Sequence, residues 1–260
     1  MMRVQILGAH AFESDGTRFM SILVDGVLAL DAGGLSCSLP LPAQEKIKAV
    51  LLTHSHADHT IGLASLSMHA FFIGATVEVY AIKHTIDAVA THIFNSSIYA
   101  DFTKMPSSSK PALRFHSVET YKPQTIEGYT VLAFPVHHTV PAVGYQVSAR
   151  DGKSILYSGD TGPELPLRWD YIHPELLILD CAGSSRWNGR APKVGHMTPA
   201  LLKLVLVEFR QRKGYLPPIV LVHMIPLFDD ERDIDGKVGE LARDLNAKID
   251  LGYEGMEIEV

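Results

Sequence analysis

Cysteine is scarce in this chain, with only Cys37 and Cys181 among 260 residues. Two thiols are too few for a disulfide framework, so we expect a reducing compartment, the cytoplasm. The sequence also lacks an apolar run long enough to span a bilayer. The short apolar stretch after Arg3 is not followed by the longer apolar region and cleavage site of a secretory signal. These absences argue against a membrane or secreted protein.

Blocks of like charge are also missing, and the formal net charge at pH 7 is −6. A protein that coats nucleic acid needs a basic face to neutralise phosphates, so the composition argues against that class of function. A small phosphate-bearing substrate held by metal ions remains compatible with it. The apolar share of 47% is ordinary for a chain with a buried core.

Short apolar runs, broken by glycine and aspartate, alternate with a few helical patterns along the chain. The runs are typical of strands, and Asp151–Gly152 indicates a hairpin turn between two of them. An amphipathic helix is expected with Thr198 as its N-cap, Pro199 at its first position and Gly214 after its end. The other expected helices cover 62–71, 83–95 and 235–249, and the expected strands include 4–9, 47–53, 77–81, 129–138, 143–149, 154–160, 175–183, 218–224 and 256–260.

The same order, strands and then helices, occurs in both halves of the chain. Two sheets packed face to face, with helices on their outer faces, would account for it. No stretch reads as a linker, so we predict a single domain over residues 1–260. Residues 101–112, rich in proline and serine, are expected to form a loop, with a lid over a site as the alternative.

The stretch "THSHADH" at 53–59 concentrates three histidines and an aspartate directly after an apolar run. His54 and His56 are two residues apart, so they project to the same side of an extended segment. Asp58 and His59 follow where a helix is expected to begin. Imidazole and carboxylate groups bind zinc, iron or manganese. The spacing therefore favours two neighbouring metal sites, one for each pair, over four unrelated side chains.

Polar residues also end three later apolar runs, where packing alone would not place them. They are His137 and His138, Asp160, and His223, and each would sit on a rigid strand end. Asp160 has two carboxylate oxygens and could bridge two metals. His137 and His138 are neighbours on a strand and point to opposite faces, so only one of them can face the metals.

The order of these motifs resembles the metallo-β-lactamase superfamily. The resemblance implies an αββα sandwich, an α/β fold of two mixed sheets flanked by helices, with a di-metal site at one edge. It implies His54, His56 and His138 at one metal, and Asp58, His59 and His223 at the other. Asp160 would bridge the two, and Asp58 and Asp160 count as catalytic. The resemblance favours His138 over His137, and a true β-lactamase would carry cysteine at the position of Asp160.

A narrower resemblance is to the class II 3′,5′-cyclic-nucleotide phosphodiesterases. It rests on "ATHIFNSSIYADFT" (90–103), "GHMTP" (195–199) and "LVHMIP" (221–226), with departures from the family at Tyr99 and Ala100. It implies that His196 contacts substrate and gives a proton to the leaving oxygen. It also suggests that Phe94 and Asn95 line a base pocket, although a helix end would equally explain Asn95. Asp31 would orient a ligating histidine, or else be a turn residue.

These features predict a di-metal phosphodiesterase that converts cyclic AMP or cyclic GMP to nucleoside 5′-monophosphates. The expected cofactors are two divalent ions, zinc or alternatively manganese or iron, and the expected partner is a small cyclic nucleotide, without membrane or nucleic acid. The alternatives are a tRNA 3′-end processing nuclease, which "HTVPAVGY" (138–145) also resembles, a di-iron redox protein, and a binding module without catalysis. The oligomeric state stays open, with a homodimer among the options.

Overall fold

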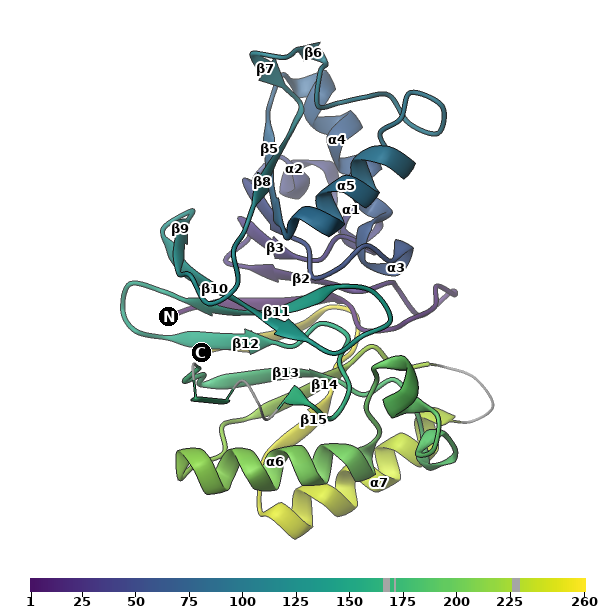
Figure 1. Cartoon of the computed structure of the whole chain (residues 1–260), viewed down its shortest axis with the longest axis vertical. Helices are drawn as coiled ribbons and strands as arrows, with labels where there is room; N and C mark the ends of the chain where they lie inside the picture. The colour runs from purple at the N-terminus through teal and green to yellow at the C-terminus, as the bar shows by residue number, and fades with distance from the viewer. Residues whose placement is uncertain (166–168, 171, 226–229) are drawn as a thin grey trace.

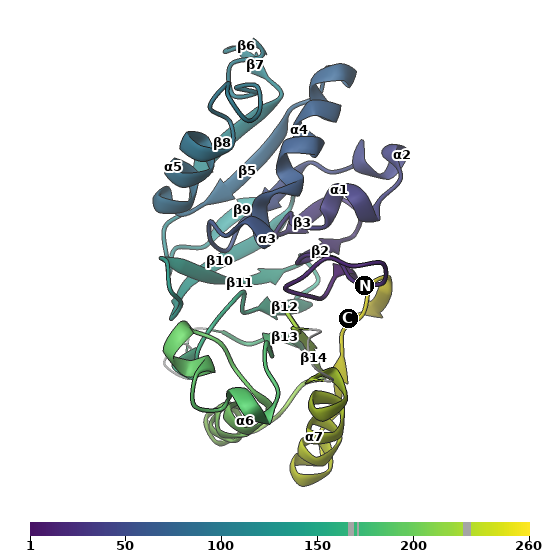
Figure 2. The same cartoon turned by 90° about the vertical axis from the view of Figure 1, so that its right-hand side faces the viewer.

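Two β-sheets packed face to face form the middle of the molecule. The structure, a computed structural model, describes residues 1–165, 169–170, 172–225 and 230–260. Helices α4 (Gly62–Ile73) and α5 (Lys83–His92) cover the outer face of the first sheet (Figure 1). Helices α6 (Pro199–Lys213) and α7 (Asp230–Leu245) cover the second sheet, as Figure 2 also shows. This αββα sandwich is the fold predicted from the sequence.

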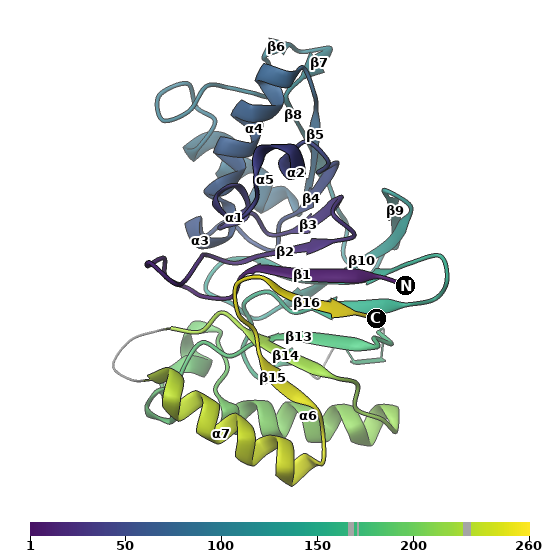
Figure 3. The same cartoon turned by 180° about the vertical axis from the view of Figure 1, so that it is seen from behind.

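The first sheet orders its seven described strands β16-β1-β2-β3-β4-β5-β8. The first strand and the last lie side by side in this sheet, and the two chain ends therefore meet (Figure 3). The bounds are β1 (Arg3–Gly8), β2 (Ser21–Val24), β3 (Leu28–Leu30), β4 (Ala49–Leu51), β5 (Val77–Ala81), β8 (Leu113–Ser117) and β16 (Met256–Glu259), with the short helices α1 (Leu35–Ser38), α2 (Leu41–Gln44) and α3 (Ala57–Thr60) between them.

The second sheet orders its seven described strands β15-β14-β13-β12-β11-β10-β9. Its two halves differ, since β9 to β12 are antiparallel neighbours and β12 to β15 are parallel. The bounds are β9 (Gln124–Ile126), β10 (Tyr129–Val136), β11 (Ala142–Ser148), β12 (Ser154–Tyr157), β13 (Leu176–Asp180), β14 (Ile219–Val222) and β15 (Ile249–Leu251), with the 3₁₀ helices η2 (Ser185–Trp187) and η3 (Ala191–Val194) before α6.

Alternation along the strands of the first sheet divides its side chains between two apolar clusters. On β2, Ile22 and Val24 point into the cluster between the sheets, whereas Leu23 joins the cluster under the helices. Leu63 and Leu66 of α4 complete that second cluster. Because successive side chains of a strand point to opposite faces, both faces of the first sheet carry buried apolar side chains.

Parallel strands bring their carboxyl ends to one edge of the sandwich. β3 and β4 run parallel in the first sheet, and β12, β13 and β14 run parallel in the second. The residues at or just after these ends are Asp31, His54, Asp160, Asp180 and His223. Polar side chains far apart in the sequence are therefore carried to one edge by rigid strands.

The structure contains elements that the sequence analysis did not predict, among them β8, β9, α1 and α2, and other elements differ in their bounds. Helix α6 has the expected bounds, but the Thr198 hydroxyl donates to Asn188 Oδ1 at 2.6 Å and does not cap the helix. Helix α5 ends at His92, three residues early. Helix α7 begins at Asp230, five residues early, and ends at Leu245, four residues early, so that Ile249 begins strand β15 and is not helical. The stretch 101–112 is mostly turn, with a small hairpin of β6 (Pro106–Ser107) and β7 (Lys110–Pro111). None of the described helices has the length and apolarity needed to cross a membrane.

Close packing at Gly144 gives a test of the fold. A Cβ there would lie 2.5 Å from the Phe134 ring on the paired strand and 2.9 Å from the Tyr157 carbonyl oxygen. Gly144→Ala should therefore lower the free energy of unfolding in urea by about 1–3 kcal/mol. Gly236→Ala is the control, because Gly236 is exposed in α7 with no neighbouring atom within 4 Å. It should raise that free energy by about 0.5–1 kcal/mol. Equal effects of the two substitutions would contradict the packing described.

Candidate metal centre

The "THSHADH" segment takes two conformations, and the change between them separates its ligands. His54 follows β4 and is fully buried. His56 keeps extended backbone, with φ −64° and ψ 150°, at the position before α3. Asp58 and His59 then lie within α3, with His59 fully buried. The first two imidazoles therefore come from an extended segment and the other two groups from a helical turn.

The structure gathers the seven predicted ligands into two groups that share Asp160. Within each group the potential ligand atoms all lie within 4.8 Å of one another. The first ligand group is His54, His56, His138 and Asp160, and the second ligand group is Asp58, His59, Asp160 and His223.

Several ligand atoms at the centre are buried without a hydrogen bond among the described residues, namely His54 Nε2, His59 Nε2 and Asp160 Oδ1. His59 Nε2 lies 3.2 Å from Asp160 Oδ1, and His54 Nε2 lies 3.6 Å from Asp160 Oδ2. Leaving buried polar atoms unpaired is costly unless something compensates them. Imidazole nitrogens around a shared carboxylate are a donor set for zinc, iron or manganese, so these residues fit a divalent metal.

His138, and not His137, faces this centre. His138 Nε2 lies 3.1 Å from His56 Nδ1, and its Nδ1 can donate to the Gly195 carbonyl at 3.2 Å. The neighbouring His137 turns away, is about half exposed, and places Nδ1 3.3 Å from Glu164 Oε2. The structure thus places His138, and not His137, beside the other predicted ligands.

The electrostatics of the centre suit a bound cation. Burial would raise the pKa of Asp160, but His223 and His59 hold it well below its usual range. Burial lowers the pKa of His54 well below its ordinary value, which leaves the neutral imidazole that a metal needs. Burial would also lower the pKa of His59, yet Asp160 and Asp31 raise it well above its ordinary value. The carboxylates therefore favour positive charge at the position of His59.

His223 occupies a left-handed backbone conformation, with φ +68°. Such a conformation is unusual for a residue other than glycine and has to be held by its surroundings. The carbonyl of Ala9 accepts hydrogen bonds from the His223 amide at 2.7 Å and the Met224 amide at 3.1 Å. His223 Nε2 then lies 3.1 Å from Asp58 Oδ2 and 3.3 Å from Asp160 Oδ2.

Asp180 is a residue of this site that the sequence analysis missed. Its Oδ2 lies 2.7 Å from His196 Nδ1, and it also accepts hydrogen bonds from the amides of Thr161 and Ala182. Burial would lower the pKa of His196, but the Asp180 carboxylate raises it to about 9. The His196 ring stacks on His223 with centroids 5.1 Å apart. Asp180 ends a fully buried strand, the same signal that identified Asp160 and His223.

Phe94 and Asn95 are not brought among the metal ligands. Phe94 is buried in the apolar cluster under the helices, edge-on to Phe102. The Asn95 carboxamide oxygen accepts hydrogen bonds from the amides of Ser97 and Ile98, as at a helix end. Both residues line a cavity of about 400 Å³ that includes none of the ligands. Their role in substrate binding stays a prediction.

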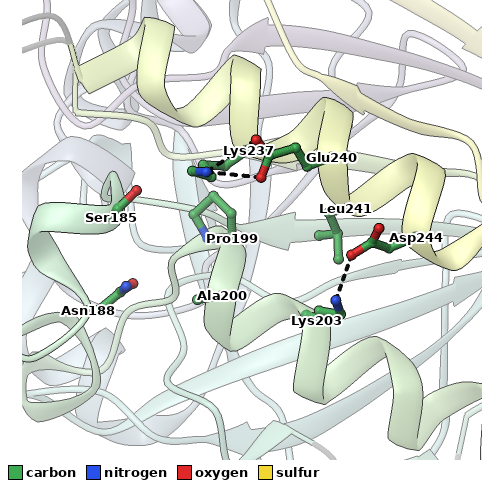
Figure 4. A pocket seen from close by; sticks show the side chains of 9 residues that line it. All are labelled: Ser185, Asn188, Pro199, Ala200, Lys203, Lys237, Glu240, Leu241 and Asp244. Atoms are coloured by element: carbon green, nitrogen blue, oxygen red, sulfur yellow. Dashed lines mark hydrogen bonds and ion pairs between the residues drawn. The ribbon is translucent and has the colours of Figure 1, made fainter.

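Another cavity, of about 270 Å³, lies between α6 and α7 (Figure 4). Its charged groups are already paired, Lys203 with Asp244 at 2.6 Å and Lys237 with Glu240 at 2.9 Å. None of the seven ligands lines this cavity. This cavity is therefore separate from the metal centre.

Comparison with known proteins gives a second line of evidence for the protein family of this chain. A family model described as the beta-lactamase superfamily domain matches residues 21–224. A probable 3′,5′-cyclic-nucleotide phosphodiesterase of Yersinia pestis is 25% identical over 218 residues, which cover 74% of this chain and 61% of that protein. Ribonuclease Z of Thermococcus onnurineus is 26% identical over 168 residues, 63% of this chain and 49% of that protein. The chain thus spans about half to three fifths of the length of these curated relatives.

Among solved structures, unliganded yeast PDE1 matches with a TM-score of 0.83 and 18% identity, over 100% of this chain and 99% of that one. At that identity the likeness concerns the fold alone. The relatives carry the names of two different activities, so they support a metal-dependent hydrolase without deciding its substrate. Because the matched domain covers well over half of the chain, and its fold and clustered histidines and aspartates agree with it, the chain belongs to the metallo-β-lactamase superfamily.

Proposed function

We propose that this protein is a di-metal phosphodiesterase that hydrolyses 3′,5′-cyclic nucleotides to nucleoside 5′-monophosphates. The observation that carries the proposal is the shared carboxylate, because Asp160 belongs to both ligand groups. When bound there, two divalent cations would supply Lewis acidity toward the phosphate oxygens and activate water for attack on phosphorus. We propose zinc as the metal, since nitrogen-rich ligand groups suit it.

The chain's own contribution to bond cleavage is a proton for the leaving oxygen. With a pKa of about 9, the His196 imidazole is protonated at neutral pH. Asp180 holds its Nδ1 at 2.7 Å, which fixes the orientation of the ring beside His223. Proton transfer needs a group held within reach of the leaving atom and in the correct protonation state. We therefore propose His196 as the general acid and Asp180 as the residue that positions it.

The substrate class is supported by sequence similarity and by charge. "GHMTP" and "THIFN" resemble cyclic-nucleotide phosphodiesterases, and one curated relative carries that name. The ribonuclease Z relatives keep tRNA processing as the second candidate. The net charge of −6 favours a small substrate, because RNA binding depends on neutralising many phosphates. The proposed partner is thus a small cyclic nucleotide of the cytoplasm.

Metal content tests the two ligand groups. Elemental analysis of the parent protein should find close to two zinc equivalents per chain. Asp160→Ala should lose both metals and phosphodiesterase activity, because Asp160 belongs to both groups. His137→Ala is the matched control, since His137 neighbours a ligand but faces Glu164, and it should keep both metals. A fully active parent with one firmly held metal would refute the two-site arrangement.

Substrate preference separates the two candidate activities. The zinc-loaded enzyme should hydrolyse cyclic AMP or cyclic GMP to the 5′-monophosphate and act poorly on pre-tRNA, with 2′,3′-cyclic nucleotides as a further comparison. Product identity by chromatography distinguishes 5′- from 3′-monophosphates. Efficient trimming of pre-tRNA with no turnover of any cyclic nucleotide would reverse the assignment.

The leaving group tests His196. A ribose oxygen needs a proton as the P–O bond breaks, whereas nitrophenolate leaves as a stable anion. His196→Ala should therefore slow turnover of a cyclic nucleotide by about 10²–10⁴-fold but cleave bis-nitrophenyl phosphate nearly as fast as the parent. Asp180→Asn should show the same pattern more weakly, with both metals retained in each variant. Equal slowing of the two substrates would mean that His196 positions phosphate and does not donate a proton.

A further inference from the structure

Hydrogen bonds connect the buried Asp31 carboxylate to one histidine of each ligand group, directly to His59 and through Thr53 to His54. Asp31 follows β3 in the first sheet, is fully buried, and has a left-handed φ of +58°. Its oxygens accept hydrogen bonds from the Thr53 amide and hydroxyl, both at 2.8 Å. They also accept from His59 Nδ1 at 2.7 Å and from the Tyr157 hydroxyl at 2.8 Å. Four donors thus converge on Asp31 from three residues.

These hydrogen bonds determine which ring nitrogen of His54 and of His59 carries no proton and is available to a metal. His59 donates from Nδ1 directly to Asp31, so Nε2 is left for a metal. The single proton of the Thr53 hydroxyl goes to Asp31, so the same oxygen can accept from His54 Nδ1 at 3.0 Å, which leaves His54 Nε2 free. One of these histidines belongs to each ligand group. Asp31 therefore holds a ligand of both predicted metals in the required tautomer.

Tyr157, in the second sheet, supplies one of the hydrogen-bond donors to Asp31. It ends β12, is almost fully buried, and precedes Asp160 by three residues. Burial, together with the negative charge of Asp31, raises the pKa of Tyr157 well above its ordinary value. Its hydroxyl therefore stays protonated and donates at any pH at which the protein would be studied. A phenylalanine in this strand would fill the same space without supplying that proton.

We infer that the Tyr157 hydroxyl is a positioning group for both metals, acting through Asp31 on His54 and His59. This inference rests on the proposed two-metal function and adds to it a residue with no direct access to a metal or substrate. A buried carboxylate is oriented by all of its donors, so the loss of one loosens the imidazoles that depend on it. The effect should reach both metal sites together, because Asp31 supports one ligand in each.

The structure offers a matched control for a merely structural role. Tyr145 lies directly across from Tyr157 in the β11–β12 pairing and is equally buried. Its hydroxyl also donates across to the first sheet, but to the Leu52 carbonyl at 2.9 Å and not to Asp31. Each tyrosine to phenylalanine change removes one buried hydrogen bond between the sheets. They differ in whether the hydroxyl donates directly to the Asp31 carboxylate, as Tyr157 does, or to a backbone carbonyl, as Tyr145 does.

The experiment is a chelator competition on the full zinc-loaded chain, comparing the parent with Tyr157→Phe and Tyr145→Phe. Tyr157→Phe should weaken retention of both zinc ions by about tenfold, the lower end of the range for hydrogen-bond partners of metal ligands. Tyr145→Phe should retain zinc like the parent, with a comparable drop in thermal midpoint. Equal zinc retention in the two variants, or weakening of one zinc only, would overturn the inference.

A double-mutant cycle with Asp31→Asn tests the route of the effect. If Tyr157 acts through Asp31, adding Tyr157→Phe to Asp31→Asn should weaken zinc retention by much less than tenfold. A full further tenfold loss would show that Tyr157 acts independently of Asp31 and would overturn the assignment. Zinc stoichiometry and cyclic-nucleotide turnover of the parent are measured first. A parent that fails those measurements contradicts the proposed function, whereas a normal parent with an unaffected Tyr157→Phe contradicts this inference alone.

Discussion

The site depends on a single buried negative charge. Asp160 is 2% exposed, and its oxygens lie within 4 Å of imidazole nitrogens of His54, His59, His138 and His223. A carboxylate in such a position is costly unless positive charge or hydrogen bonds compensate it. The surrounding strand ends place imidazoles at that point, and these can carry a proton or bind a cation. Residues from both sheets thus compensate the Asp160 charge at this edge.

Two residues near this charge adopt backbone conformations that side chains seldom accept. Asp31 and His223 both have positive φ, and each lies directly after a buried strand. Residues in such conformations persist where the surrounding structure holds them, and they concentrate at functional sites. At both positions the left-handed conformation directs the side chain toward the metal centre, where Asp31 contacts His59 and His223 contacts Asp160. Backbone strain at these two positions is thus associated with the geometry of the centre.

Glycine allows the loop after β3 to lie against the ligand-bearing helix. A Cβ on Gly33 would lie 1.8 Å from the Asp58 carbonyl oxygen, and one on Gly62 would lie 2.3 Å from the Ala32 carbonyl oxygen. No side chain fits at these distances without moving backbone. The close approach brings Asp31 within hydrogen-bond distance of His59, so a packing detail of the first sheet supports a ligand of the second group.

The sequence by itself determined which residue types meet at this site and most of the elements that carry them. "THSHADH" and the strand-ending His138, Asp160 and His223 are local patterns, and the period of apolar residues indicates strands without any knowledge of the fold. Only the tertiary structure decided which distant groups touch. Tyr157 looks like an ordinary core residue in its strand, and its partner Asp31 lies 126 residues earlier in the other sheet. Asp180 ends β13, and His196 lies 16 residues later in the loop before α6. Phe94 contributes to the core, which its motif did not reveal. The physical reason is that a side chain's type is set locally, whereas its hydrogen-bond partner depends on how two sheets pack.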